Sequence, residues 1–228
     1  MIWDVAATQV GRFLSARRCL RAMFPRRRAP GKTYQGFIKR LLKLNAVLPA
    51  VQQHLRQAIR HACGDCWMRE GHLAFAVDGS RIECPRTIAN EKQFGHAGKK
   101  GCGPQMWLTT LWHMGSGLPW AWKQGPAADS ERMHVRELLP LLPPASLLVA
   151  DAGFAGFDLL NMILDAGHSF LFRVGGNVRL LTQLGRVELH GEDTVWLWPQ
   201  GRRKEQPLVL RLVELRREGR CVYLITNL

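Results

Sequence analysis

The sequence lacks the features that define several protein classes. Its 228 residues contain six cysteines, too few for a disulfide scaffold. Glycine (22) and proline (12) are close to ordinary usage, which excludes collagen-like and low-complexity chains. The longest uncharged stretch, Cys102 to Trp122, is interrupted by glycine, proline and polar residues and is not typical of a membrane span. With no recognisable signal peptide, we expect a folded protein of the reducing cytoplasm without a membrane partner.

Acidic residues are absent between Val5 and Gly64, a stretch that holds thirteen of the 32 lysines and arginines. The rest of the chain holds the other 19 basic residues and all 18 acids, so nearly all of the net charge of +14 belongs to the first quarter. An acid-free helical segment is the electrostatic footprint of polyanion binding. The candidate nucleic-acid contacts in it are Arg26, Arg27, Arg28, Lys39, Arg40 and Lys43.

The same basic segment could instead be a solvated basic face or a tether to anionic lipid. A membrane-surface helix pairs its charges with a bulky apolar face containing Trp or Phe, so the sequence favours nucleic acid. Residues 34–62 place apolar side chains three or four apart, as on one face of a helix. Pro49 lacks an amide donor and predicts a break or kink there. We expect residues 1–70 to form an all-helical module that binds DNA or packs on the rest.

A mixed α/β layer is predicted for residues 71–175. Short continuous apolar runs, typical of strands buried on both faces, lie at 73–77, 147–150 and 169–174. Two more strands are expected at 105–113 and 118–123, and helices at 131–142 and 158–166. A polar, glycine-rich loop is expected from 84 to 104, where Lys99 and Lys100 are candidate phosphate contacts.

The last segment, 176–228, is predicted to be all β. Its expected strands are 178–184, 186–189, 194–198, 208–213 and 222–226, separated by glycine, aspartate and basic turns.

Two of the apolar strands lead into an aspartate followed within two residues by glycine: Asp78 and Asp151. In open α/β sheets, sites form outside the carboxyl ends of parallel strands. If the two strands are parallel neighbours, these carboxylates lie side by side and repel unless a cation or a proton neutralises them. Hard oxygen ligands suit Mg²⁺ or Mn²⁺, the ions of phosphodiester chemistry. The alternative is that both aspartates only cap turns.

Two sequence blocks resemble DDE transposases of the insertion-sequence-four family. The first-aspartate block is Val77-Asp78-Gly79-Ser80-Arg81-Ile82-Glu83, continued by Cys84-Pro85-Arg86-Thr87, and the second is Val149-Ala150-Asp151-Ala152-Gly153-Phe154. Between them, Leu108 to Gly115 and then Gly117-Leu118-Pro119-Trp120 also resemble that family. The resemblance covers about residues 73 to 227.

The resemblance implies an RNase H-like fold with an N-terminal helical module and a β-rich insertion at 176–228. It implies Asp78 and Asp151 as catalytic ligands of Mg²⁺ or Mn²⁺. It also implies cleavage at transposon ends followed by attack of the freed 3′ hydroxyl on target DNA, so double-stranded DNA is the expected partner and the nucleoid the expected location. A homodimer is an arrangement that the sequence leaves open.

The chain departs from the family pattern at the third acid. The family places a glutamate on a helix with a Tyr, Arg, Glu, Lys pattern, after a strand similar to residues 222–227, and the sequence ends at Leu228. We therefore expect a C-terminally truncated transposase without its third acidic residue, whose strand transfer is lost. The alternatives are a non-catalytic DNA-binding remnant that competes with intact transposase, or a pseudogene product without function.

Cys63 and Cys66 have the spacing of metal ligands, and His61 and His72 lie nearby in the sequence. A zinc site needs four ligands, and no second pair with suitable spacing is present. Structural thiols are therefore the favoured interpretation, and zinc is the alternative.

Overall fold

The structure, a computed structural model, describes residues 9–23, 25, 33, 35–36, 39, 43–96, 102–174, 185–190, 193–199, 201–202, 204–217 and 219–228. The chain divides into two compact units, residues 1–54 and residues 55–228. Among the helices that the structure describes, none is long and apolar enough to cross a membrane.

The described part of the first unit is helical. Helix α1 spans Gln9–Met23, and a 3₁₀ turn, Lys43–Val47, leads into α3, Leu48–Ala62. The break expected at Pro49 is confirmed, because α3 begins at Leu48 and Pro49 lies in its first turn, where a missing amide costs no hydrogen bond. The α3 residues from Leu55 onward belong to the second unit.

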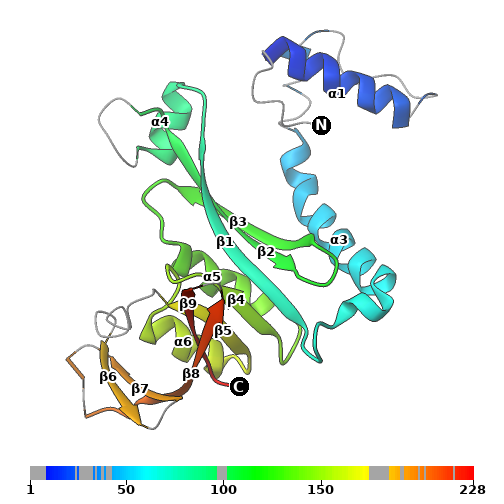
Figure 1. The fold of residues 1–228 in the computed structure, drawn as a ribbon. Helices are drawn as coiled ribbons and strands as arrows, with labels where there is room; N and C mark the ends of the chain where they lie inside the picture. Colours follow the sequence, from blue (N-terminus) through cyan, green and yellow to red (C-terminus); the bar gives the residue numbers. More distant parts are fainter. Residues whose placement is uncertain are drawn as a thin grey trace. The chain divides into compact units, whose positions relative to one another are not determined.

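The second unit is built on one mixed sheet of nine strands in the order β3-β2-β1-β4-β5-β9-β8-β7-β6 (Figure 1). Strands β1, β4 and β5 run parallel to one another, and every other pairing is antiparallel. The strands are β1 (Ala74–Glu83), β2 (Gln105–His113), β3 (Leu118–Pro126), β4 (Leu147–Ala150), β5 (Ser169–Val174), β6 (Gly185–His190), β7 (Thr194–Pro199), β8 (Leu208–Arg217) and β9 (Arg220–Thr226).

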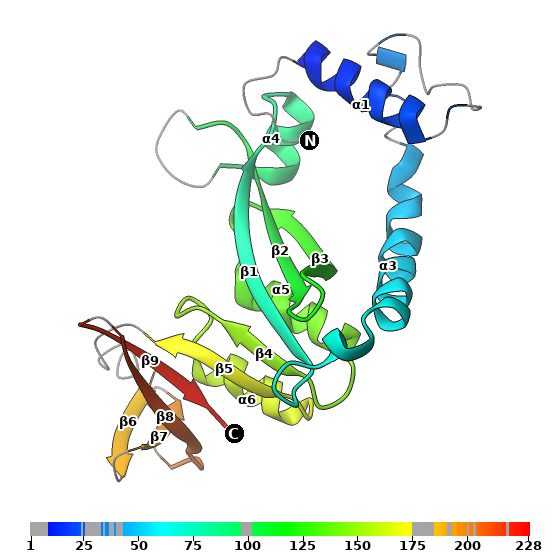
Figure 2. The same ribbon diagram turned by 45° about the vertical axis from the view of Figure 1, so that its right-hand side comes forward.

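Two helices pack on this sheet and contact each other. Helix α5 (Glu131–Leu138) lies against β1, β2 and β3, and α6 (Phe157–Asp165) lies against β5 and β7 (Figure 2). A shorter helix, α4 (Ile88–Phe94), follows β1, and 3₁₀ turns lie at Gly64–Trp67 and Leu139–Leu141. This mixed α/β layer with flanking helices is consistent with an RNase H-like fold.

The core forms where the sheet meets these helices. Side chains of the central strands, including Phe75, Leu148, Phe170 and Phe172, are 0% exposed. The continuous apolar runs thus form strands in which most side chains, up to Val77 in β1, are buried or half-buried, as their composition predicts. Trp120 extends this core, and its indole nitrogen donates a 2.8 Å hydrogen bond to the carbonyl oxygen of Leu141.

The sequence-based boundaries need four corrections. Strand β1 does not end before Asp78 but continues to Glu83, because residues beyond Val77 still pair with β2. The expected loop at 84–104 contains α4, capped by the Thr87 hydroxyl, which accepts a bond from the Asn90 amide. The helix expected to run to residue 142 ends at Leu138 and continues as a 3₁₀ turn.

The fourth correction concerns β8, which extends to Arg217, four residues beyond the expected end. Strand β9 pairs with β5 as well as with β8, so the C-terminal strands prolong the same sheet and do not form a separate one. The strand expected at 178–184 lies outside the described residues.

Candidate active site

Asp78 and Asp151 occupy matching positions on neighbouring parallel strands. The β1–β4 register pairs Ala76 with Val149, and counting two residues forward on each strand places Asp78 opposite Asp151. Pairing ends before this point, β4 stops at Ala150, and both aspartates are exposed. Because parallel strands lie about 4.8 Å apart, the two carboxylates emerge at the same edge of the sheet. The expected parallel pairing of the two strands is therefore confirmed.

Each aspartate is held by the backbone of a glycine that follows it. The Gly79 amide donates to Asp78 Oδ1 at 2.8 Å, and the Gly153 amide donates to Asp151 Oδ1 at 2.9 Å. Among the described residues, the other oxygen, Oδ2, of each carboxylate has no hydrogen-bond or ion-pair partner. The two side chains are thus fixed through one oxygen, and the other remains available to a ligand.

A third carboxylate, that of Glu131, lies beside these two. Its side chain covers the α-carbon of Gly79, so that a Cβ added there would lie 2.5 Å from Glu131 Oε1. Burial raises the pKa of Glu131, and the neighbouring charges of Asp151 and Asp78 raise it further, while Arg81 and Arg132 lower it. We call Asp78, Glu131 and Asp151 the acidic edge. Its carboxylates repel one another because the nearby cations only partly offset their charge.

Glu131 could not be found from the sequence. It lies twenty residues before Asp151, on no recognised motif, and reaches the edge because α5 packs across β1 and β2. The predicted helix start was the only signal. Ser130 occupies the N-cap position of α5, but its side chain makes no capping hydrogen bond.

Arg132 ties the first turn of α5 to the loop that follows Asp151. Its Nε and Nη2 donate to the Gly153 carbonyl oxygen at 3.1 and 3.0 Å, and Nη2 also donates to the Ala155 carbonyl oxygen at 2.9 Å. A Cβ at Gly156 would lie 2.9 Å from Arg132 Nη1, so a glycine there leaves room for the guanidinium. The same helical turn therefore supports both aspartate-bearing segments, through Glu131 over Gly79 and through Arg132 on this loop.

Three hydrogen-bonded side chains, the buried Thr109 and His134 and the exposed Asp129, link α5 to the sheet. The Thr109 hydroxyl lies 2.9 Å from His134 Nδ1, and His134 Nε2 lies 3.0 Å from Asp129 Oδ2. Thr109 pairs with Gly79 in the β1–β2 ladder, which places these side chains directly beneath the acidic edge. Since Thr109 is 0% exposed, its hydroxyl cannot meet a substrate. The three side chains therefore position the helix and do not form a nucleophile.

The acidic edge offers hard oxygen donors, the chemistry that suits Mg²⁺ or Mn²⁺. Burial raises the pKa of Glu131 most, and the charges of Asp151 and Asp78 raise it further, a repulsion that a bound divalent cation would relieve. In the described part of the chain, however, no three His, Cys, Asp or Glu side chains approach closely enough to form a complete cage. The residues fit a cation held by two exposed aspartates whose remaining positions go to water or substrate.

The structure describes only some of the other candidate residues. Lys39 and Lys43 are exposed in the first unit. Cys63 packs with its sulfur 4.0 Å from His113 Nδ1, whereas Cys66 is exposed, and both are free thiols. Across the described ranges they belong to no group of metal ligands, so zinc binding gains no support. The remaining predicted DNA contacts, Arg26, Arg27, Arg28, Arg40, Lys99 and Lys100, fall outside the described residues.

Comparison with known proteins places most of the chain in one family. The profile of the family described as "Transposase DDE domain" matches residues 69–222, which include Asp78, Glu131 and Asp151. The chain belongs to this family. DDE transposases generally use divalent metal ions.

Among solved structures, the chain is similar to a piggyBac transposase in a synaptic complex with hairpin DNA, with 12% identity and a TM-score of 0.39. The match covers 85% of this chain and 43% of that one, so the chain spans less than half the length of this relative. No curated protein sequence matches the chain.

Proposed function

We propose that this chain is the catalytic core of a DNA transposase of the insertion-sequence-four type, in which Asp78 and Asp151 bind one divalent cation. The observation that carries the proposal is the β1–β4 register, which sets the two aspartates opposite each other within the segment that matches the family. Both carry a free carboxylate oxygen among the described residues, as ligands of an incoming cation must.

The reaction would proceed by two phosphoryl transfers. In the first, water attacks the phosphorus at a transposon end, and the bond to the departing strand breaks to leave a free 3′ hydroxyl. In the second, that hydroxyl attacks a phosphorus of target DNA, and the target strand leaves through its own 3′ oxygen. A bound Mg²⁺ or Mn²⁺ would supply Lewis-acid stabilisation of the charge that develops on the phosphoryl oxygens. Asp78 and Asp151 would hold it, while Arg132 keeps the Asp151 loop in place.

We further propose a division of labour along the chain. Residues 1–70 would bind duplex DNA through their basic side chains, residues 71–175 would carry the chemistry, and residues 176–228 would extend the sheet as the β-rich insertion of the family. The acid-free stretch from Val5 to Gly64 within the first segment supports this role, because phosphate contacts need positive charge and little sequence-specific geometry.

Cleavage of DNA carrying matched transposon ends tests the proposal. In Mn²⁺ we expect metal-dependent cleavage by the chain. Asp78→Asn and Asp151→Asn should each lower the rate by at least about 100-fold, since each removes a ligand charge. Asp193→Asn is the matched control, because Asp193 is exposed and pairs with Arg211 away from the acidic edge.

The outcomes of this assay separate the proposal from its main alternative. Cleavage that persists in both aspartate variants would contradict the assigned site. Firm binding of the DNA ends without any cleavage would instead support a non-catalytic protein that competes for those ends.

A further inference from the structure

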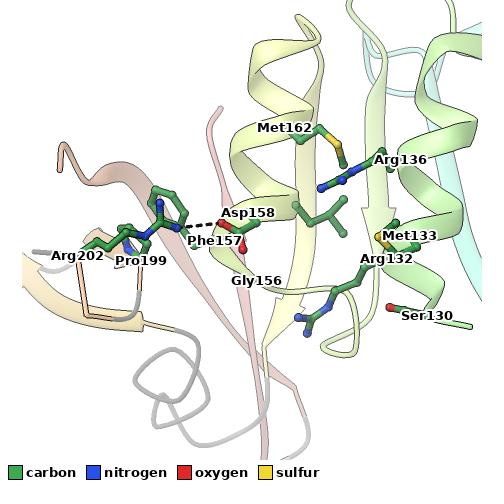
Figure 3. A pocket seen from close by; sticks show the side chains of 11 residues that line it. Ser130, Arg132, Met133, Arg136, Gly156, Phe157, Asp158, Met162, Pro199 and Arg202 are labelled. Atoms are coloured by element: carbon green, nitrogen blue, oxygen red, sulfur yellow. Dashed lines mark hydrogen bonds and ion pairs between the residues drawn. The ribbon is translucent and has the colours of Figure 1, made fainter. Parts of the chain in front are cut away.

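A pocket of about 500 Å³ opens between the N-terminal halves of α5 and α6 and the end of β7. We call this cavity the arginine pocket, because three of its lining residues are arginines: Arg132, Arg136 and Arg202. Asp158 is the acidic residue among those that line it. Arg132 and Arg136 come from α5, and Arg202 approaches from the opposite wall (Figure 3). The lining therefore carries a net positive charge within a sheet unit whose acids and bases are otherwise nearly balanced.

The three arginines differ in how far they are already engaged. Arg132 binds the carbonyl oxygens of Gly153 and Ala155, and Arg202 pairs with Asp158 at 3.4 Å and with Glu205 at 3.2 Å. Arg136 is exposed and has no hydrogen-bond or ion-pair partner among the described residues. Its guanidinium extends into the gap between the two helices, toward Met162 (Figure 3). The pocket thus holds a free planar donor group, the type that binds phosphate through paired hydrogen bonds.

The rest of the lining suits a nucleotide better than a bare anion. Met133, Phe157 and Met162 contribute apolar surface, and Ser130 contributes a hydroxyl that forms no cap with its own helix. A phosphate on the arginines would leave the attached sugar or base against these side chains. The volume is also within the range of small-ligand sites, about 300–1,000 Å³.

The pocket and the acidic edge share one loop. Gly153, whose amide holds Asp151, gives its carbonyl to Arg132, and Gly156 from the same loop lines the pocket. A phosphate bound by the arginines would therefore lie beside the loop that also holds Asp151, a ligand of the proposed cation site.

We infer that the arginine pocket binds a backbone phosphate of the DNA strand that lies at the acidic edge, with Arg136 as its principal contact. This inference rests on the proposed function for the identity of the ligand, and it adds a subsite that sets the position of the strand. The pocket would anchor one phosphate while the neighbouring one meets the proposed cation site.

Salt titration of DNA binding tests this subsite. The full chain would be bound to a short duplex of random sequence, without divalent metal, and the logarithm of affinity plotted against that of salt concentration. Loss of one phosphate contact makes the slope less negative by about 0.9. We expect that change for Arg136→Gln, with weaker binding of all sequences alike, and a slope close to wild type for Arg136→Lys, which keeps the charge.

Arg216→Gln is the matched control, because Arg216 is an exposed arginine of β8 outside the pocket. It removes the same formal charge, and we expect its slope to equal that of the wild type. If Arg136→Gln and Arg216→Gln give the same slope, the pocket contributes no phosphate contact and the inference is wrong.

The metal-free binding measurement also keeps this inference separate from the proposed function. A changed slope for Arg136→Gln together with no cleavage at all would retain the phosphate site and reject the catalytic proposal. Cleavage that depends on Asp78 and Asp151, together with an unchanged salt slope for Arg136→Gln, would retain the catalytic proposal and reject the phosphate site.

Discussion

Strands β1 and β4 and strands β7 to β9 belong to one sheet, yet their acidic side chains have different partners. In the antiparallel part, Asp193 pairs with Arg211 at 3.3 Å and Glu214 with Arg216 at 2.6 Å. At the acidic edge, in the described part of the chain, Asp78 and Asp151 accept hydrogen bonds only from backbone amides. Acids that merely solubilise a surface gain from adjacent cations, so unpaired acids grouped at a strand edge indicate a ligand site.

Packing differs between the same two regions and gives the largest expected effect. Leu148, on β4, is 0% exposed, whereas Leu215, on β8, is 51% exposed. Leu148→Ala should lower the free energy of unfolding by about 2–5 kcal/mol, because it leaves a cavity among close-packed strands. Leu215→Ala should change it by no more than about 0.5 kcal/mol. Urea denaturation measures both, and equal losses would mean that the two regions are packed alike.

Arginines provide a second contrast of intermediate size. Arg132 makes three hydrogen bonds to loop carbonyls, two to the exposed Gly153 and one to the buried Ala155, and its removal should cost about 1.5–3 kcal/mol of unfolding free energy. Arg216 makes one exposed ion pair, which contributes little because solvent screens it. We therefore expect Arg132→Ala to lower the melting temperature clearly and Arg216→Ala to leave it almost unchanged. A larger effect of Arg216→Ala in thermal unfolding would reverse the comparison.

Neutralising Glu131 and neutralising Glu214 should change the melting temperature in opposite directions. The pKa of Glu131 is raised by burial and by Asp151 and Asp78, whereas hydrogen bonds from Arg216 and Cys221 lower the pKa of Glu214. A raised folded-state pKa favours the native state at low pH, and that advantage is lost as pH rises through it. A lowered pKa stabilises at neutral pH, and that gain is lost as pH falls.

Thus Glu131→Gln should raise the melting temperature at neutral pH by about 1 °C in metal-free protein, because solvent screens part of the repulsion. Glu214→Gln should lower it slightly, and both differences should shrink toward pH 4. Added Mg²⁺ should remove the difference in melting temperature between Glu131→Gln and the wild type, and should leave the difference for Glu214→Gln unchanged. A fall in melting temperature for Glu131→Gln would show that the acidic edge is not under charge repulsion.

The sequence predicted the strands of this fold better than it predicted where they end. Continuous apolar runs predict β4 and β5 with their observed bounds, 147–150 and 169–174, because most positions of both strands are buried or half-buried and hold apolar residues. The end of β1 was missed because, among the described strands, residues beyond Val77 pair with β2 alone, and their side chains are exposed or half-buried. Helix α4 was missed because its seven residues bury no side chain completely.

The candidate site shows the same limit. Asp78 and Asp151 could be predicted because each follows an apolar run, and parallel strands bring such positions together. Glu131 and Arg136 could not, because they reach their positions through the packing of α5 on α6 and the sheet, and no local pattern of residues records that packing. Arg202 comes from still farther along the chain, at the end of β7.

Calorimetric titration of Mn²⁺ into the wild type, Asp78→Asn, Asp151→Asn and the double variant tests most directly whether the two aspartates share one ion. We expect a single site, a marked loss of affinity in each single variant, and little further loss in the double variant, because removing either ligand already breaks the shared site. Asp193→Asn should bind like the wild type. Single variants that bind Mn²⁺ as tightly as Asp193→Asn would show that the two aspartates do not share an ion.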